Sequence, residues 1–375
     1  MRSFKDMIYS LAEKGEKNAF RFPTGKTFGA LTYAEFSYKA HALAAGFSAM
    51  GLAGKRIAVI GETSPEWVAT YLAVAASGGV IIPMDKELAI GEIEGLLAGV
   101  DAEAIVYAAT FNQKMMSVME NHPTLHVFVP ISPAEGCTAE KVVPFDAVLE
   151  MGKKSLEQGY QLPHRDPESL AVMLFTSGTT GSSKCVMLCE KNICACVNAA
   201  CATVNFNEND VTVSVLPLHH TYELAIMLAS FCYGITIGIN DTLRHLMRNF
   251  AEFKPTGLIL VPLFVNTMYK RIWDEARKKG KDKLLRNMIK LSNGMRKVGI
   301  DLRRKLFGSV LAAFGGRLEK IICGGAPLNP EMVKNFEAFG IQICEGYGIT
   351  ECSPLISVAP YYAPKAGSVA QMTKE

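Results

Sequence analysis

The 375-residue sequence is sparingly charged and lacks both a long hydrophobic run and a Cys-x-x-Cys pair. Charged residues make up 20% of the chain and the net charge is +3, so we expect no nucleic acid or other polyanion as partner. The uncharged stretches Val68–Met84 and Leu224–Asn240 both contain glycine and read as helix, turn and strand, not as membrane spans. The first residues lack the apolar segment of a secretory signal. We therefore expect a cytoplasmic globular protein.

The ten cysteines include no Cys-x-x-Cys pair, although five of them lie between residues 185 and 201. A long chain without a secretory signal is expected to keep its thiols reduced. A helical segment after residue 184 would spread these five over several faces. We interpret them as small buried apolar residues, with a metal site as the weaker alternative.

Short apolar runs alternate with helix-like segments along the chain. Pro65 to Ser77 is one such predicted helix, with proline near its start. The runs predict strands over Arg56–Gly61, Gly79–Pro83, Ala104–Tyr107, Val127–Pro130, Ala171–Phe175, Val211–Leu216, Gly257–Val261, Leu318–Ile322 and Gly340–Cys344. This alternation is typical of the α/β class, with parallel sheets covered by helices on both faces. A polar segment between Pro163 and Pro167 predicts a boundary between domains at 1–165 and 166–366.

The stretch from Thr176 to Lys184 combines two glycines with six hydroxyl side chains and ends in lysine. Glycine lets backbone N–H groups approach phosphate oxygens, hydroxyls donate to them, and lysine adds a point charge. The preceding strand would place this loop where open α/β sheets bind their ligands. The spacing matches neither the Walker loop nor the dinucleotide-binding pattern. We interpret the stretch as a phosphate loop, with an ordinary surface turn as the alternative.

Two later segments strengthen that interpretation: Gly324-Gly325-Ala326-Pro327, and Glu345-Gly346-Tyr347-Gly348-Ile349-Thr350-Glu351. Together with the loop they resemble the adenylate-forming superfamily of acyl- and aryl-CoA synthetases, firefly-type luciferases and peptide-synthetase adenylation domains. The insertion at Lys270–Lys305 and the following Gly315-Gly316-Arg317 look most like the long-chain fatty acyl-CoA synthetase branch. The resemblance implies the N-terminal part of that fold, with two parallel-rich sheets, and residues 367–375 as the start of a third subdomain that is absent here.

The resemblance also implies roles for individual residues. Tyr347 would stack on adenine, Thr350 would donate to the α-phosphate, and Thr176 and Glu351 would help to hold Mg²⁺. His220 would lie near the reacting carboxylate, so the implied catalytic residues are His220, Lys184 and Thr350. The implied nucleotide-binding residues are Thr176, Ser177, Gly178, Thr179, Thr180, Gly181, Lys184, Gly324, Gly325, Ala326, Pro327, Glu345, Gly346, Tyr347, Gly348 and Thr350. The alternatives are a core aromatic at Tyr347, a surface charge at Glu351 and a structural histidine at His220.

The function implied is ATP-dependent activation of a carboxylic acid, with a fatty acid favoured, as an acyl-adenylate. In the full-length protein the acyl group would pass to CoA, making it an acid–thiol ligase. Two alternatives stay open: a non-catalytic nucleotide- or acyl-binding module, and adenylation with a carrier-protein thiol as acceptor. The family's later ribose-binding aspartate, phosphate-binding arginine and catalytic lysine have no match here, so residues 1–375 alone are expected to turn over poorly.

Ser183, Cys185 and Leu263 depart from the family's usual proline, glycine and arginine. The acid and the oligomeric state are not predicted.

The segment Lys270–Lys305 is distinctly basic, with 14 basic and 4 acidic residues. Its apolar residues are spaced as on helices. We expect a helical excursion whose apolar stripe packs on its own domain, and we keep peripheral contact with an anionic membrane as the alternative.

Overall fold

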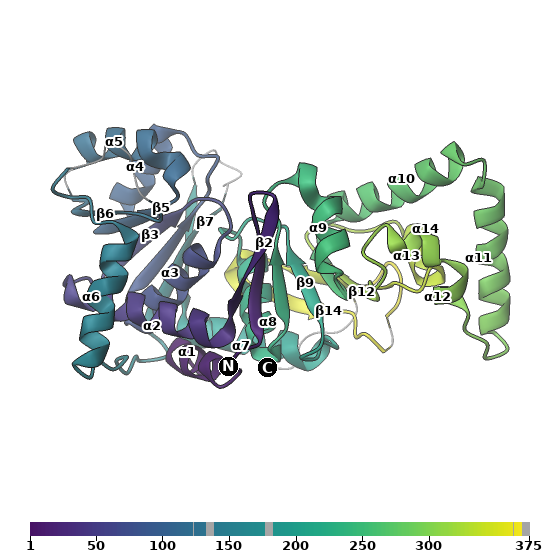
Figure 1. Ribbon diagram of the computed structural model, residues 1–375, viewed down its shortest axis with the longest axis horizontal. Helices are drawn as coiled ribbons and strands as arrows, with labels where there is room; N and C mark the ends of the chain where they lie inside the picture. Colours follow the sequence, from purple (N-terminus) through teal and green to yellow (C-terminus); the bar gives the residue numbers. More distant parts are fainter. Residues whose placement is uncertain (123, 133–138, 177–182, 363, 370–375) are drawn as a thin grey trace. The chain divides into compact units, whose positions relative to one another are not determined.

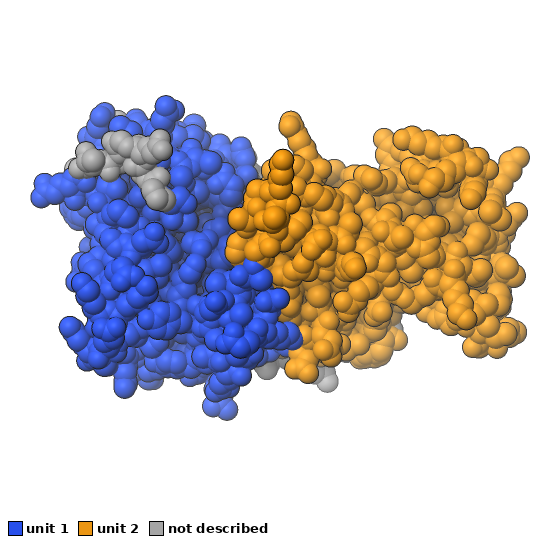
Figure 2. Space-filling model, in the orientation of Figure 1, with its two compact units in different colours: residues 1–20, 30–197, 217–234 blue, residues 21–29, 198–216, 235–375 orange. Residues whose placement is uncertain are grey.

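The computed structural model describes residues 1–122, 124–132, 139–176, 183–362 and 364–369. The chain divides into two compact units, coloured blue and orange in Figure 2. Unit 1 comprises residues 1–20, 30–197 and 217–234, and unit 2 comprises residues 21–29, 198–216 and 235–375. The boundary expected at 165/166 thus falls inside unit 1, because the strand that follows it pairs into the unit 1 sheet.

Unit 1 contains a six-stranded sheet in which neighbouring strands are parallel except for the last pair. In spatial order its strands are β6 (Val127–Pro130), β5 (Ala104–Tyr107), β3 (Arg56–Ile60), β4 (Val80–Met84), β7 (Leu170–Thr176) and β8 (Lys184–Cys189). The first five confirm the strands predicted in this half of the chain. The prediction of a helix directly after the loop is wrong. Val186 and Leu188 are buried while Cys185 and Met187 are exposed, so this segment forms an antiparallel edge strand.

Helices cover both faces of this sheet (Figure 1). On one face, alternate side chains of β3, β4 and β5 form a core cluster with α4 (Ile90–Gly99) and α5 (Asn112–Asn121). On the other, α3 (Pro65–Ala76) contacts β3 and β4. The helix α3 confirms the prediction, and it begins where the Ser64 hydroxyl accepts from the Trp67 N–H at 3.1 Å. The remaining unit 1 helices are α1 (Phe4–Ala12), α2 (Tyr33–Ala49), α6 (Phe145–Glu157), α7 (Glu190–Thr203, which runs into unit 2) and α8 (Thr221–Tyr233).

Two glycines let α2 and α6 approach each other closely. A Cβ on Gly152 of α6 would lie 1.7 Å from the Ala42 carbonyl oxygen, and one on Gly46 of α2 would lie 2.2 Å from the Val148 carbonyl oxygen. Neither separation is physically possible, so the close approach of the two helices requires glycine at both positions.

Unit 2 contains the predicted second run of parallel strands. β11 (Gly257–Leu260), β12 (Lys320–Cys323) and β13 (Gln342–Gly348) are parallel, and β14 (Leu355–Val358) returns antiparallel to β13. A third sheet pairs β9 (Val211–Ser214) in parallel with β10 (Thr236–Ile239), next to β1 (Asn18–Thr24) and β2 (Thr27–Thr32). The two-sheet expectation did not include this sheet, because β1 and β10 are more than 200 residues apart in sequence.

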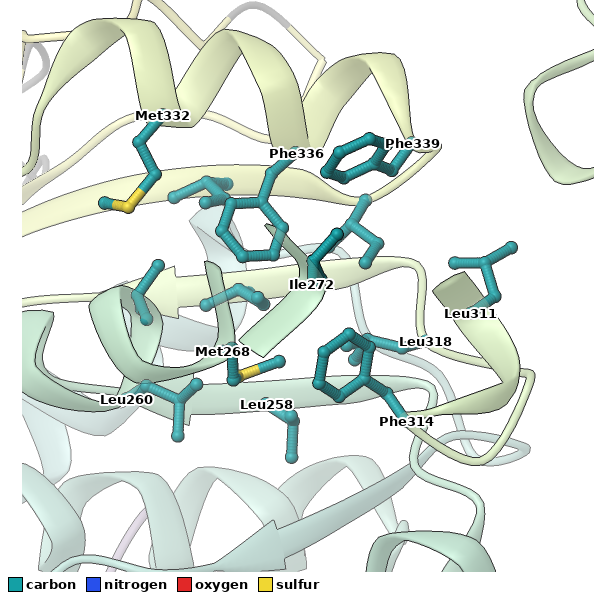
Figure 3. Close-up of a cluster of buried hydrophobic side chains, with 14 of the residues drawn as sticks. Leu258, Leu260, Met268, Ile272, Leu311, Phe314, Leu318, Met332, Phe336 and Phe339 are labelled. Atoms are coloured by element: carbon teal, nitrogen blue, oxygen red, sulfur yellow. The ribbon is translucent and has the colours of Figure 1, made fainter. Parts of the chain in front are cut away.

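Helices of unit 2 pack on the β11–β14 sheet. Figure 3 shows Met268 and Ile272 of one helix, and Phe336 and Phe339 at the end of another, with Leu258 and Leu260 of β11. These helices are α9 (Leu246–Phe253), α10 (Pro262–Lys278), α11 (Asp282–Arg296), α12 (Arg303–Leu306), α13 (Gly308–Ala312) and α14 (Pro330–Ala338). The short 3₁₀ helices of the chain are η1 (Ala109–Phe111), η2 (Leu243–His245) and η3 (Thr350–Cys352).

A buried ion pair within unit 2 joins the residue before β9 to the first residue of β12. Lys320 donates to Asp210 at 2.8 Å, and their side chains are only 5% and 7% exposed. Thr256 donates to the other Asp210 oxygen at 2.5 Å, and Lys320 also donates to the Asn205 carbonyl at 2.5 Å. Since these residues stand at the starts of β9, β11 and β12, the pair aligns the amino ends of three strands.

The basic segment forms helices, as predicted. Ile272, Trp273, Leu285 and Ile289 are buried in the unit 2 core, which is the packing expected for the apolar stripe. Leu284 belongs to the same predicted stripe but is 53% exposed. Across the part of the chain that the structure describes, no helix is both long and apolar enough to cross a bilayer.

The α2–α6 contact generates a stability prediction. Gly152→Ala forces a methyl group into the Ala42 carbonyl, and we expect it to destabilise the protein by about 1–3 kcal/mol. The measurement is urea unfolding followed by circular dichroism. The matched control is Gly95→Ala in α4, where no atom lies within 4 Å of the new Cβ. That change should be neutral or stabilising by up to about 1 kcal/mol. Equal effects of the two changes would contradict the packing described here.

Candidate active site

Two adjacent strands of unit 1 flank the predicted phosphate loop. Thr176 is the last residue of β7, and Lys184, the first residue of β8, is its cross-strand partner. Lys184 is exposed. The loop thus begins at the carboxyl end of a sheet strand, as predicted, but it leads into an edge strand. Of the residues predicted to bind phosphate, Ser177, Gly178, Thr179, Thr180 and Gly181 lie outside the described residues.

An acidic residue stands beside this loop strand that the sequence interpretation did not single out. Asp85 directly follows β4, which pairs with β7 through Ile81 and Val172. In that register Asp85 and Thr176 occupy corresponding positions at the carboxyl ends of neighbouring strands. A polar residue just after a buried parallel strand is a recognisable signal for a binding site, and it was available in the sequence.

Asp85 faces the histidine pair that precedes α8. Its Oδ2 lies 3.6 Å from His219 Nε2, and the rings of His219 and His220 are 4.1 Å apart between centroids. The predicted residue, His220, is the exposed member of the pair, while the His219 side chain is 12% exposed. Three predicted site residues, Thr176, Lys184 and His220, therefore belong to unit 1. Asp85 and His219 belong to the same unit and were not among the predicted residues.

Both histidines are held in the neutral form at pH 7. Burial lowers the pKa of His219 to about 4, with His220 adding to the effect, Asp85 opposing it and Lys86 adding a smaller contribution. Desolvation by the surrounding chain also lowers the pKa of His220, again opposed by Asp85. Neutral imidazoles can donate or accept a hydrogen bond near a reacting carboxylate, but they carry no charge to neutralise it.

Unit 2 brings the two other predicted segments to a single sheet edge. β12 and β13 are parallel neighbours, with Cys323 opposite Glu345, so the chain leaves both strands at the same edge. Gly324, Gly325, Ala326 and Pro327 follow β12 directly, and Gly325 adopts a φ of +94°, which favours glycine. Gly325, Ala326 and Pro327 are exposed there. This is the edge at which α/β sheets place ligands.

The second segment forms the end of β13 and a tight turn. Tyr347 lies on the strand and is 52% exposed, which excludes a core position for its ring. Thr350 and Glu351 lie in η3, which connects β13 to β14. Gly348 has a structural reason to be glycine, since a Cβ there would lie 2.1 Å from the Pro354 carbonyl oxygen. Gly346 has no such restriction, with 3.7 Å of separation to its nearest neighbour.

Glu345 has a structural role in this arrangement. It is 5% exposed, and its two carboxylate oxygens accept from the Gly367 N–H at 2.8 Å and the Leu328 N–H at 3.5 Å. Those bonds tie the chain after β12 and the segment at Gly367 to β13. The side chain predicted to face the nucleotide thus holds the two neighbouring segments in position.

Two predicted residues, one in each unit, have oxygen atoms of the kind that hard cations take as ligands. Thr176 offers a hydroxyl, and Glu351 offers an exposed carboxylate that forms no salt bridge with any described residue. Magnesium in proteins takes oxygen ligands of this kind and usually keeps several waters. The predicted residues divide between the units, with Thr176, Lys184 and His220 in unit 1 and Gly324–Pro327 and Glu345–Glu351 in unit 2.

The clustered cysteines divide between two elements. Cys185 and Cys189 lie on β8, whereas Cys194, Cys196 and Cys201 lie on α7. Cys194 and Cys196 are buried, and burial raises the pKa of Cys194 to about 12, so that thiol stays protonated. Within the described ranges, no three His, Cys, Asp or Glu side chains are arranged to hold a metal ion.

Comparison with known proteins identifies the family of this chain. The family model described as "AMP-binding enzyme" matches residues 9–374. The chain belongs to the AMP-binding enzyme family. It is 28% identical over 345 residues to the peroxisomal long chain acyl-CoA synthetase 6 of Arabidopsis thaliana, covering 87% of this chain and 48% of that protein. It is 27% identical over 368 residues to human long-chain-fatty-acid–CoA ligase 6, covering 92% and 52%. The chain therefore spans about half the length of these AMP-binding relatives.

Solved structures confirm the fold. The adenylation domain of a carboxylate reductase from Mycobacterium chelonae superposes with a TM-score of 0.77 at 19% identity, covering 93% of this chain and 58% of that one. At this identity the likeness establishes the α/β fold of this chain and nothing about its substrate.

The histidine pair generates a testable pKa prediction. Because Asp85 raises the pKa of both rings against the effect of burial, Asp85→Asn should lower the pKa of His219 and of His220 further. The measurement is an NMR titration of the imidazole Cε1 protons. His41 is the internal control, since burial alone lowers its pKa and Asp85 does not act on it. An unchanged or raised His219 pKa would show that Asp85 is not the opposing charge.

Proposed function

We propose that this chain carries the ATP- and carboxylate-binding part of an acid–thiol ligase whose acid is a fatty acid. The observation that carries the proposal is the meeting of Gly324–Pro327 with Tyr347–Glu351 at one edge of the unit 2 sheet, in a member of the AMP-binding enzyme family. The fatty acid and CoA are favoured by the names of the two relatives, which are a long chain acyl-CoA synthetase and a long-chain-fatty-acid–CoA ligase.

In the proposed reaction a carboxylate oxygen attacks the α-phosphorus of ATP, and the bond to the leaving pyrophosphate breaks. Tyr347 stacks its exposed ring on adenine, and Thr350 donates to the α-phosphate as charge develops there. Lys184 contacts the β- and γ-phosphates. Thr176 and Glu351 would hold Mg²⁺, and the bound metal would offset negative charge on the phosphates.

His220 is proposed to orient the substrate, and the second half-reaction transfers the acyl group to CoA. The neutral ring of His220 hydrogen-bonds the substrate carboxylate and orients it without an ionic contact that would weaken its nucleophilicity. The CoA thiol then attacks the acyl carbonyl, a thioester forms, and AMP leaves. Transfer to a carrier-protein thiol is the second candidate; the carboxylate reductase neighbour supports it only to the extent of a shared fold.

The test is fatty-acid-dependent exchange of labelled pyrophosphate into ATP, measured on the complete gene product. We expect exchange with long-chain acids and not with benzoate, and acyl-CoA formation when CoA is added. Nucleotide binding without exchange in the complete gene product would instead identify a non-catalytic binding module.

Lys184 provides a second test of the proposed triphosphate site. Lys184→Ala should weaken MgATP binding about tenfold, because it removes one charge-assisted contact, and should leave AMP binding unchanged. Isothermal calorimetry on the complete gene product measures both. The matched control is Lys191→Ala, an exposed lysine of unit 1 whose partner is Glu168 at 2.6 Å. Equal losses for MgATP and AMP would contradict contact with the outer phosphates.

A further inference from the structure

A cavity of about 560 Å³ lies among the helices of the basic segment in unit 2. Its apolar wall comes from three directions: α10 supplies Ile272 and Ala276, α11 supplies Leu285 and Met288, and the region of α13 supplies Val310 and Phe314. Ile272 and Phe314 are drawn in Figure 3, where they lie next to each other beside the sheet. The size is within the range of small-molecule sites, which are mostly apolar with a few polar groups.

The charged side chains of this cavity are mostly basic. Arg271, Lys279 and Lys281 line it, against a single carboxylate at Glu275. Glu275 is paired with Lys279 at 3.0 Å, so those two charges offset each other. Arg271 and Lys281 are exposed, and neither forms a salt bridge within the described chain. The cavity thus combines an apolar interior with two positive charges that form no salt bridge within the described chain.

The apolar lining and the basic side chains of the cavity favour one class of ligand. Besides the charged groups, Ser309 is the single polar side chain of the lining, which is too few donors for a nucleotide or a sugar. The excess of basic over acidic side chains disfavours a cationic ligand. None of the residues of the predicted nucleotide site lines the cavity. Leu284, 53% exposed, extends the apolar surface to the mouth, as expected for a chain-like ligand that enters from outside.

We propose that this cavity is an accessory binding site for a long-chain fatty carboxylate, with the acyl chain among α10, α11 and α13 and the carboxylate at Arg271 and Lys281. The bound acid is not activated here, because no residue of the nucleotide site lies within the cavity. The proposal goes beyond the proposed function and does not depend on it.

Trp273 offers a local probe. The sequence has two tryptophans, and Trp67→Phe leaves Trp273 alone, buried beside Ile272 and covered by the Arg286 guanidinium at 4.8 Å. A stearate brominated at mid-chain, used below its micelle concentration, should quench Trp273 fluorescence saturably, and plain stearate should reverse the quenching. If Trp67→Phe unfolds, the difference in quenching between the wild-type chain and Trp273→Phe reports the same contact.

Two sets of variants test the two features of the cavity. Arg271→Gln with Lys281→Gln should raise the half-saturating concentration about five- to tenfold, the scale of two exposed ion pairs. The matched control is Lys283→Gln with Lys290→Gln, which removes two exposed α11 lysines outside the lining and should change nothing. Ala276→Phe fills the cavity and should abolish saturable quenching, with thermal unfolding as the check that the chain still folds.

Three results would overturn the proposal. They are the absence of saturable quenching, an equal loss in the control pair, and quenching that requires anionic phosphatidylserine vesicles and not the monomeric acid. The last would identify a membrane-docking face instead. Fatty-acid-dependent pyrophosphate exchange is measured on the same variants. Quenching without exchange would support this site while contradicting the proposed function, and exchange without quenching would do the reverse.

Discussion

The buried pair of Lys320 and Asp210 is the interaction on which the arrangement of unit 2 depends. Both charges are removed from water, so neither is tolerable without the other, and loss of one partner of such a pair costs about 3–5 kcal/mol. Asp210 also accepts from Thr256, which precedes β11, so the pair fixes the starts of β9, β11 and β12. Once those amino ends are aligned, parallel pairing carries β11, β12 and β13 to a common opposite edge. The ion pair therefore positions the candidate site from the far end of the strands.

At that edge the motif residues divide into those that shape the backbone and those that face outward. Glu345 uses both carboxylate oxygens on backbone N–H groups, and Gly348 is required by the Pro354 carbonyl. Tyr347 and Glu351, by contrast, are exposed. A short motif can thus contain residues that are necessary for different physical reasons. Substitution of Glu345 or Gly348 acts on the fold first, whereas substitution of Tyr347 or Glu351 tests ligand contact more directly.

The strands and helices with the strongest local patterns could be predicted from the sequence. β5 and β6 match their predicted bounds, and α3 was marked by Ser64 and Pro65 at its start. Two kinds of feature could not be predicted in this way. The third sheet depends on pairing between β1 and β10, which no local pattern encodes. The strand β8 has alternating burial, but its exposed positions are Cys185 and Met187, which are apolar enough to hide the period of two. Of the site, the motif segments were recognisable, and the position of Asp85 just after a buried strand was a signal available in the sequence. The contact of Asp85 with the histidine pair and the carboxylate bonds of Glu345 required three-dimensional structure.

The electrostatics of unit 1 limit what its residues can contribute to an anionic substrate. Asp85 brings a carboxylate to the carboxyl end of β4, level with Thr176. The two histidines beside it stay neutral at pH 7 because desolvation by the surrounding chain lowers the pKa of each ring more than Asp85 raises it. Neither ring can therefore supply positive charge to a phosphate or a carboxylate. Among the predicted side chains of unit 1, that leaves Lys184 as the cation at the loop. A triphosphate carries more negative charge than one lysine neutralises, so the proposed chemistry requires a further cation, which is consistent with the oxygen ligands offered by Thr176 and Glu351.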